Sequence, residues 1–280
     1  MEDKTDTLKQ AVETVAAEFE LEVAALLAVC RVESGGVVTA KVGGREEPVI
    51  RFEGHYFHRL LPAVKRNRAI VAGLASARAG AVRNPVSQAR RWKLLGEAIE
   101  IDRPAALAST SWGVGQVMGA HWRWLGYASV DAMVCELRSG GEGQVRAMAR
   151  FIVKAKLDDF IAEHDWAGFA RAYNGPGYRR NRYDTKMAEA YAAITGIRTR
   201  PQRNAVLVLR LGSAGPAVEQ LQDNLRALGY PLIADGDFGF ATQAAVRAFQ
   251  KSVRLGADGI AGQKTLLAMD RKLPPLALAG

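Results

Sequence analysis

The fold of the N-terminal part of the chain is decided by the stretch Ala24-Ala-Leu-Leu-Ala-Val-Cys-Arg-Val-Glu-Ser-Gly-Gly36. Leu26, Cys30 and Glu33 are spaced four and three residues apart, so on a helix they share one face. This spacing places a glutamate on an apolar helix face, at the C-terminal end. Two glycines then end the helix and let another segment or a ligand come close. Apolar surroundings and the negative end of the helix dipole both disfavour a charged carboxylate, which suits Glu33 to be a general acid.

The hydrophobic pattern outside this stretch predicts a mostly helical protein with one short β-hairpin. Residues 8–33 have helical apolar spacing with a break near residues 20–22, and residues 37–53 change to a two-strand pattern. Helical patterns return over residues 55–61, 63–79, 85–100 and 143–163. A polar, proline-bearing segment follows, which predicts a linker at 198–205 between a large domain, 1–197, and a small one, 206–280.

The composition is that of a folded, water-soluble protein. The 280 residues are 49% hydrophobic and 24% charged, enough to bury a core without disulfides. Cys30 and Cys135 are interpreted as small buried hydrophobic residues in a reducing compartment. The polar, acidic N-terminus lacks the features of a secretory signal, and no apolar run reaches the ~18 residues of a membrane helix. We therefore expect the protein to accumulate in the cytoplasm of the cell that makes it.

Two further motifs in the large domain have the residue types of a ligand-binding cleft. Ser111-Trp-Gly-Val-Gly-Gln-Val-Met118 is a glycine-rich turn followed by glutamine, which suits close backbone approach to an extended ligand. Ala172-Tyr-Asn-Gly-Pro-Gly177 places a Tyr-Asn pair on a turn. With the Glu-Ser of residues 33–34, this order of motifs resembles the goose-type lysozymes and soluble lytic transglycosylases. The resemblance implies that Glu33 is the catalytic acid. It also implies that the glycan contacts Ser34, Gly113, Gln116, Tyr173 and Asn174.

A closer resemblance is to the phage-type N-acetylmuramidase family. Its hallmark is a Gly-Arg pair followed by an apolar strand and a Phe-Glu-x-His helix start, which here are Gly44-Arg45 and Phe52-Glu-Gly-His55. The likeness covers about residues 8–195, and the insertion Glu46-Glu47 departs from the usual loop. It implies a mainly α-helical, lysozyme-like α+β catalytic domain with a short β-hairpin.

Glycoside hydrolysis commonly needs a second carboxylate, which acts on the cation-like centre or on the water. Strand alternation over residues 49–53 puts Glu53 on the face opposite to the apolar side chains, where it would line a cleft across from Glu33. Glu46 and Glu47 are interpreted as solvated charges in the turn. One of them stays open as a replacement for Glu53.

The histidines do not predict a metal site. His55 and His58 have helical spacing, and with Cys30 or His121 they offer zinc-ligand residue types, but no third ligand lies at zinc-site spacing. We therefore expect catalysis without a metal or other cofactor.

The small domain contains an internal repeat, D-G-x-x-G-x-x-T, at residues 235–242 and 258–265. A helix is expected from Pro216 to Leu228, capped by Gly229. Residues 206–270 resemble the peptidoglycan-binding three-helix domain of bacterial and phage cell-wall enzymes. The resemblance implies a small three-helix bundle that contacts peptidoglycan through Asp235, Gly236, Phe238, Gly239, Asp258 and Gly259.

The chain is basic, with 38 Lys and Arg against 29 Asp and Glu, a net charge of +9. The excess is concentrated in residues 61–103 and 179–203, whereas residues 206–270 are neutral. A basic surface attracts polyanions, and the sequence has no nucleic-acid-binding motif. We therefore expect peripheral attraction to an anionic cell envelope rather than nucleic-acid binding.

These observations together predict an endolysin-like peptidoglycan hydrolase. It would be a monomer that cleaves the β-1,4 bond between N-acetylmuramic acid and N-acetylglucosamine, and it would reach the cell wall after the membrane is permeabilised. Two alternatives stay open. One is a lytic transglycosylase, which uses one acid and leaves 1,6-anhydro ends, and the other is a non-catalytic wall-binding or virion structural protein.

Overall fold

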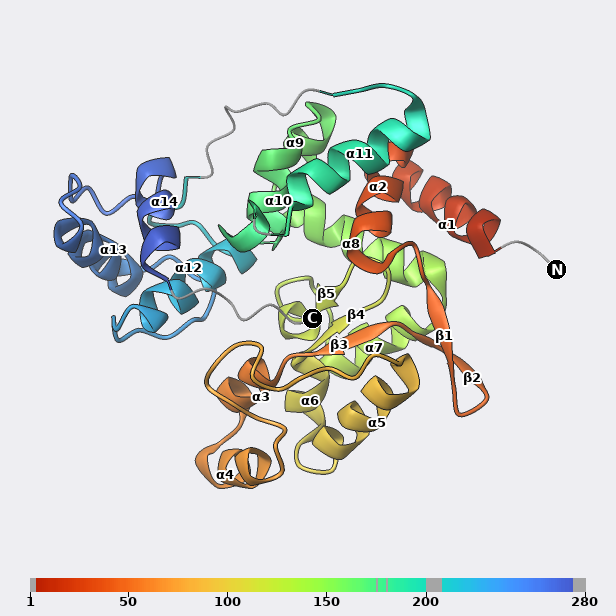
Figure 1. Cartoon of the computed structure of the whole chain (residues 1–280), viewed down its shortest axis with the longest axis horizontal. Helices are drawn as coiled ribbons and strands as arrows, with labels where there is room; N and C mark the ends of the chain where they lie inside the picture. Colours follow the sequence, from red (N-terminus) through yellow and green to blue (C-terminus); the bar gives the residue numbers. More distant parts are fainter. Residues whose placement is uncertain (1–3, 175, 180, 200–207, 274–280) are drawn as a thin grey trace. The chain divides into compact units, whose positions relative to one another are not determined.

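The protein is mainly α-helical, with a two-stranded and a three-stranded sheet within the part of the chain that is described (Figure 1). The computed structural model describes residues 4–174, 176–179, 181–199 and 208–273. The chain divides into two compact units, the first up to Lys154 and the second from Ala155. The linker expected at 198–205 lies outside the described residues from residue 200 onward.

The first unit contains eight α-helices and one 3-10 turn within its described residues. These helices are α1 (Lys4–Phe19), α2 (Val23–Ser34), α3 (Gly54–Leu60), α4 (Ala63–Val71), α5 (Gln88–Ile99), α6 (Arg103–Ala108), α7 (Val130–Arg138) and α8 (Gly141–Lys154), with a 3-10 turn η1 (Gly119–His121). The predicted break near residues 20–22 is confirmed. The helix expected over 63–79 is shorter than predicted, because the chain turns at Gly73, whose φ is +73°. Across the described residues, no helix combines the length and apolarity needed to cross a bilayer.

The sheets of the first unit differ from the single hairpin that the sequence predicts. The strands are β1 (Thr39–Val42), β2 (Arg45–Pro48), β3 (Ile50–Phe52), β4 (Thr110–Trp112) and β5 (Val117–Met118). β1 and β2 form the hairpin around Gly43-Gly44, whose positive φ angles suit a two-residue turn. β3 instead pairs antiparallel with β4, Ile50 opposite Trp112 and Phe52 opposite Thr110. The glycine-rich stretch therefore forms two short strands and the turn that joins them.

Charged side chains also join distant helices of this unit. Arg146 on α8 donates from Nε to Glu18 of α1 over 2.8 Å and from Nη2 to Glu142 over 2.5 Å. Cys30 is buried in α2 as expected, but Cys135 is exposed on α7, so the interpretation of both cysteines as core residues is wrong for Cys135.

The named elements of the second unit are all helices within its described residues, and two isolated β-bridges join Leu209 to Ala261 and Ala214 to Asp237. Its elements are α9 (Asp158–Ala162), α10 (Trp166–Asn174), η2 (Pro176–Arg179), α11 (Tyr183–Thr195), α12 (Pro216–Ala227), α13 (Phe240–Ser252) and α14 (Gln263–Lys272). Tyr173 and Asn174, expected on a turn, are the last two residues of α10. The expected helix from 216 to 228 is confirmed as α12, with Gly229 just beyond it.

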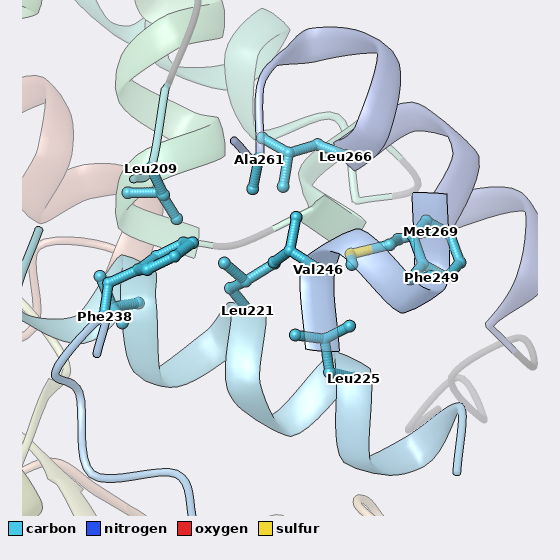
Figure 2. Close-up of a cluster of buried hydrophobic side chains, with 10 residues drawn as sticks. Leu209, Leu221, Leu225, Phe238, Val246, Phe249, Ala261, Leu266 and Met269 are labelled. Carbon is cyan, nitrogen blue, oxygen red and sulfur yellow. The ribbon is translucent and has the colours of Figure 1, made fainter. Parts of the chain in front are cut away.

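The last three helices share a core of their own. Figure 2 shows side chains of α12, α13 and α14 pointing toward one another, together with Leu209, Phe238 and Ala261 from the connecting segments. The buried members are Leu209, Val218, Leu221, Leu225, Phe238, Val246, Phe249, Ala261, Leu266 and Met269. Every member lies between residues 209 and 269, so this core is built from one continuous segment of the sequence.

The internal repeat is visible as two equivalent hydrogen-bond networks, the first centred on Gln222. The Nε2 of this buried side chain donates to Asp235 Oδ1 over 2.8 Å, to the Asp237 carbonyl over 2.9 Å and to Thr242 Oγ1 over 2.9 Å. Its Oε1 accepts from the backbone N–H of Gly236 over 2.8 Å. One glutamine thus ties a turn to the start of the helix that follows.

Gln250 makes the same bonds to the second copy of the repeat. Its Nε2 donates to Asp258 Oδ1 over 2.7 Å, to the Ile260 carbonyl over 3.0 Å and to Thr265 Oγ1 over 3.0 Å. Its Oε1 accepts from the Gly259 N–H over 2.9 Å. The aspartate, glycine and threonine of the repeat are therefore used to build the turns.

Replacing either buried glutamine should loosen its turn. Gln222→Ala or Gln250→Ala leaves buried donors and acceptors without partners and should lower stability by about 3 kcal/mol. Hydrogen–deuterium exchange of residues 208–273 in rising urea measures this. Gln220→Ala, an exposed position on the same helix, is the matched control and should change stability by less than about 0.5 kcal/mol. Exchange as slow as in the parent for both buried-site variants would contradict the role of the networks.

Candidate active site

Glu33 lies in the last turn of α2, half-buried, at the end of the helix's apolar face. Leu26 and Cys30 on that face are fully buried. Burial, with the negative charge of Glu33 adding to it, raises the pKa of the Cys30 thiol well above its ordinary value. Leu26, Cys30 and Glu33 all lie within α2 at the predicted spacing, so the three residues share one helix face. The helix ends at Gly35, whose φ is +67° and whose N–H donates to the Arg31 carbonyl.

Glu53 stands directly after β3, at the residue that precedes α3. Its backbone N–H donates to the Ser109 carbonyl over 2.7 Å, which continues the β3–β4 pairing by one residue. Its carboxylate accepts a 2.8 Å hydrogen bond from Arg51 Nε, and the other oxygen lies 3.5 Å from His55 Nδ1. The side chain is 18% exposed. The Arg51 contact confirms that residues 51 and 53 share a side of the chain, as strand alternation predicts.

Sequence reasoning missed Arg51 and His55 as partners of Glu53. Each lies two residues from Glu53, one before and one after, so their spacing was a usable signal in a strand that leads into a helix. Arg51 is hydrogen-bonded to one oxygen of the carboxylate, and His55 lies near the other. A carboxylate fixed in this way is preorganised to interact with positive charge that develops nearby.

The strand before Glu53 is paired on both edges. On the edge away from β4, side chains replace a neighbouring strand. Asn84 accepts from the Phe52 N–H over 2.9 Å and donates to the Phe52 carbonyl over 2.7 Å. Gln88 accepts from the Ile50 N–H over 2.9 Å, and Arg91 donates to the Ile50 carbonyl over 3.1 Å. These bonds fix the backbone that carries Glu53.

Glu46 and Glu47 lie in β2 rather than in the turn. Glu46 is exposed and accepts a 2.6 Å hydrogen bond from Thr39 Oγ1. Glu47 is buried and forms a two-bond ion pair with Arg138 of α7, in which the Nε–Oε2 distance is 2.8 Å. The interpretation of Glu47 as a solvated charge is therefore wrong, because Arg138 allows the carboxylate to be buried.

The glycines of the 111–118 motif serve internal packing. A Cβ on Gly113 would lie 2.7 Å from Gln144 Oε1, and one on Gly115 would lie 2.7 Å from Met148 Cγ. Both partners are on α8, and Gln144 also accepts from the Val114 N–H over 3.0 Å. The close backbone approach that the sequence suggested is thus made at least to α8, a neighbouring helix of the same chain.

The other expected glycan contacts are placed as follows. Ser34 donates to the Cys30 carbonyl of its own helix over 3.1 Å. Gln116 has a φ of +48° and donates to the Gly113 carbonyl over 2.8 Å, which closes the β4–β5 turn. In the second unit, the Tyr173 ring stacks on the Phe169 ring, with the ring centroids 5.1 Å apart, and Asn174 is half-buried.

The histidines do not gather into a metal centre. Within the described ranges, no three His, Cys, Asp or Glu side chains are arranged to hold an ion. His121 is buried among aromatic rings, and its ring centroid lies 5.6 Å from that of Phe151. Burial, with the charge of Arg59 adding to it, lowers the pKa of His121 to about 4, so its imidazole is neutral at neutral pH.

The expected peptidoglycan contacts of the small domain have mixed exposure. Asp235, Gly239 and Asp258 are exposed, whereas Gly236 and Gly259 are buried where they donate to the glutamine networks. Phe238 is 2% exposed and belongs to the core of the bundle. Phe238 therefore supports the fold and presents almost no surface to a ligand.

Comparison with known proteins identifies two families along the chain. The N-acetylmuramidase family matches residues 22–195, and a peptidoglycan binding domain matches residues 214–269. Among solved structures, an endolysin of the Burkholderia phage AP3 is similar, with 31% sequence identity and a TM-score of 0.58, over 68% of this chain and 71% of that one.

Two curated proteins match shorter parts. The zinc D-Ala-D-Ala carboxypeptidase of Streptomyces albus G is 54% identical over 59 aligned residues, in a match that covers 19% of this chain. The type VI secretion system spike protein VgrG3 of Vibrio cholerae is 42% identical over 78 aligned residues, in a match that covers 23% of this chain. The matches span only 22% and 8% of the lengths of these two relatives.

The packing of Gly113 can be tested directly. Gly113→Ala puts a side chain at a φ of +67° and against the buried Gln144, so it should lower stability by about 2–4 kcal/mol. Gly96→Ala in α5 is the control, since its new methyl group has nothing within 4 Å and should raise stability by about 0.5–1 kcal/mol. Urea unfolding followed by tryptophan fluorescence measures both. Equal unfolding midpoints for the two variants would contradict the assigned packing.

Proposed function

The chain belongs to the N-acetylmuramidase family, and on that premise we propose that it is a peptidoglycan hydrolase that cleaves the β-1,4 bond between N-acetylmuramic acid and N-acetylglucosamine. The family match over residues 22–195 carries the proposal, because it includes Glu33, Glu53 and the other expected contacts of the catalytic part. The similarity to a phage endolysin supports an enzyme of the same type.

We assign Glu33 as the general acid. It stands half-buried at the end of an apolar helix face, where desolvation and the helix dipole favour the protonated form. In the reaction it would donate its proton to the glycosidic oxygen as the bond to the leaving sugar breaks. The glycines after it leave room for a polymer to approach.

We assign Glu53 as the second carboxylate. Arg51 donates a hydrogen bond to one of its oxygens and His55 lies 3.5 Å from the other, so Arg51 helps to orient the group before substrate arrives. It would stabilise the cation-like sugar, activate water or attack the anomeric carbon. Glu46 and Glu47 are poorer candidates, because Glu47 is neutralised by Arg138 and Glu46 lies exposed on the hairpin.

We propose that Ser34, Gln116, Tyr173 and Asn174 contact the glycan, with Gly113 shaping the turn that carries Gln116. The acids and motifs then belong to a catalytic domain of residues 1–197, which a linker at 198–205 joins to a wall-binding domain of residues 206–280. The exposed edges of the two repeat turns, at Asp235, Gly239 and Asp258, are the proposed contacts of that domain with peptidoglycan. Gly236, Phe238 and Gly259 would act by holding the turns in shape.

We further propose that the protein works as a monomer without a metal or cofactor. It would be made in the cytoplasm and reach the wall once the membrane is permeabilised. Its net charge of +9 would favour approach to an anionic envelope.

Amide substitution of the two acids tests the assignment. Glu33→Gln should abolish nearly all lysis of purified peptidoglycan, because an amide cannot donate the required proton, and Glu53→Gln should lower the rate by at least about a hundredfold. Glu46→Gln, on the exposed side of the hairpin, is the matched control and should stay close to the parent rate. A folded Glu33→Gln variant that still lyses the wall at the parental rate would refute the assignment of the acid.

Mass spectrometry of the released fragments tests the reaction type in the same samples. Hydrolysis leaves reducing N-acetylmuramic acid ends. Mostly 1,6-anhydro ends, with Glu53→Gln almost fully active, would instead indicate a lytic transglycosylase. Absence of any new ends would indicate a wall-binding protein without catalysis.

The proposed separation of a catalytic domain from a wall-binding domain predicts how fragments of the chain behave. Residues 206–280, which contain a complete apolar core of their own, should co-sediment with purified peptidoglycan and release no sugar. A fragment that ends near residue 203 should cleave soluble glycan but act more slowly on intact wall, because a tethered binding domain raises the local concentration of the enzyme at the polymer. Failure of the small fragment to co-sediment would remove the wall-binding assignment.

A further inference from the structure

The segment from Gly54 to Gly96 is strongly one-sided in charge. It contains no aspartate or glutamate. Its basic residues are Arg59, Lys65, Arg66, Arg68, Arg78, Arg83, Arg90, Arg91 and Lys93. A run of this length with nine cations and no acid produces a local positive field that opposite charges in the same segment do not offset.

The helix α4, within this segment, presents apolar side chains to solvent. Val64 is 85% exposed, Val71 90% and Ile70 45%. Residues 64, 68 and 71 follow each other at helical spacing, so exposed Arg68 lies between the two valines on one face. The loop that follows adds Val86, which is 97% exposed. Single exposed hydrophobic residues are normal, but several on one short helix mark an interaction surface.

The inner side of α4 holds the helix in place without using these residues. Arg66 donates to the carbonyls of His58 and Leu61, each over 2.7 Å, and Lys65 contacts Asp102 over 2.8 Å. Ala69 is the buried residue of the helix. In Figure 1, α4 lies beside α3 at the edge of the first unit. The outward side chains are therefore available for a partner while the helix stays fixed.

Exposed cations on α4 and on the loop that follows it are also available. Arg68, Arg78 and Arg83 are exposed, and none of the three makes an ion pair with another residue of the described chain. An interface with an anionic lipid bilayer requires this combination, because apolar side chains enter the boundary between headgroups and acyl chains while arginines contact the lipid phosphates. A protein partner would satisfy the valines equally well, but the unpaired positive charge favours the lipid.

We propose that α4 and the loop after it form a contact surface for anionic phospholipid bilayers. We call it the α4 patch, made of Val64, Arg68, Ile70 and Val71 with Arg78, Arg83 and Val86. Binding is peripheral and reversible, because three valines and one isoleucine bury little apolar area. The inference does not depend on the proposed function, since it uses no residue assigned to cleavage.

Vesicle co-sedimentation of the full chain tests the α4 patch. The protein binds vesicles of equal parts phosphatidylglycerol and phosphatidylcholine, does not bind pure phosphatidylcholine, and is released as salt rises. Val64→Ser with Val71→Ser weakens binding by about tenfold. Arg68→Gln with Arg83→Gln weakens it by about fivefold for each arginine.

Matched substitutions elsewhere control for general loss of hydrophobicity or charge. Val37→Ser with Ile233→Ser alters exposed side chains outside the patch, and Arg45→Gln with Arg210→Gln removes the same charge from other exposed positions. Both leave vesicle binding near the parental value, and circular dichroism verifies that every variant is folded.

Three outcomes overturn the proposal. They are equal binding to neutral vesicles, equal loss of binding in the control variants, and no binding combined with self-association that Val64→Ser with Val71→Ser abolishes. The last result would assign the patch to a second copy of the chain. None of these outcomes bears on wall cleavage, because the vesicles contain no peptidoglycan.

Discussion

The backbone of β3 must be paired on both edges, because Ile50 and Phe52 are completely buried and water cannot reach the groups between them. One edge pairs with β4. Asn84, Gln88 and Arg91 complete the other edge with side-chain amides and a guanidinium. The position of Glu53 follows from this arrangement, since its own N–H extends the β4 side. Closing both edges therefore fixes the backbone of the three-residue strand that leads directly into Glu53.

Sequence reasoning succeeded for features that neighbouring residues encode. Residues with a helical or strand period encode three such features. They are the end of α2, the side of the chain on which Glu53 lies, and the three-helix bundle. Such patterns can be read from one sequence because the spacing itself determines which side chains share a face. Leu26, Cys30 and Glu33 illustrate this, as do the repeat turns at residues 235–242 and 258–265.

The features that could not be predicted depend on residues far apart in the chain. Nothing near Glu47 indicates that Arg138 will neutralise it, and no period links Asn84 to Phe52. The glycines at 113 and 115 were expected to admit a ligand, yet α8 occupies the space beside them. A glycine indicates that another group packs closely against the backbone, but the sequence does not identify that group. The role of Phe238 was misread for a related reason, since a motif shared within a family includes the residues that build its core.

The glutamine networks of the small domain also determine how it can fold. The bonds of Gln222 span 13 to 20 residues of sequence, and those of Gln250 span 8 to 15. In the first unit, the contacts Glu47–Arg138 and Glu18–Arg146 span 91 and 128 residues. Short-range contacts form quickly because little chain entropy is lost in closing them. The C-terminal bundle can therefore become compact within a short stretch of new chain, whereas the first unit cannot complete its contacts until α8 has left the ribosome.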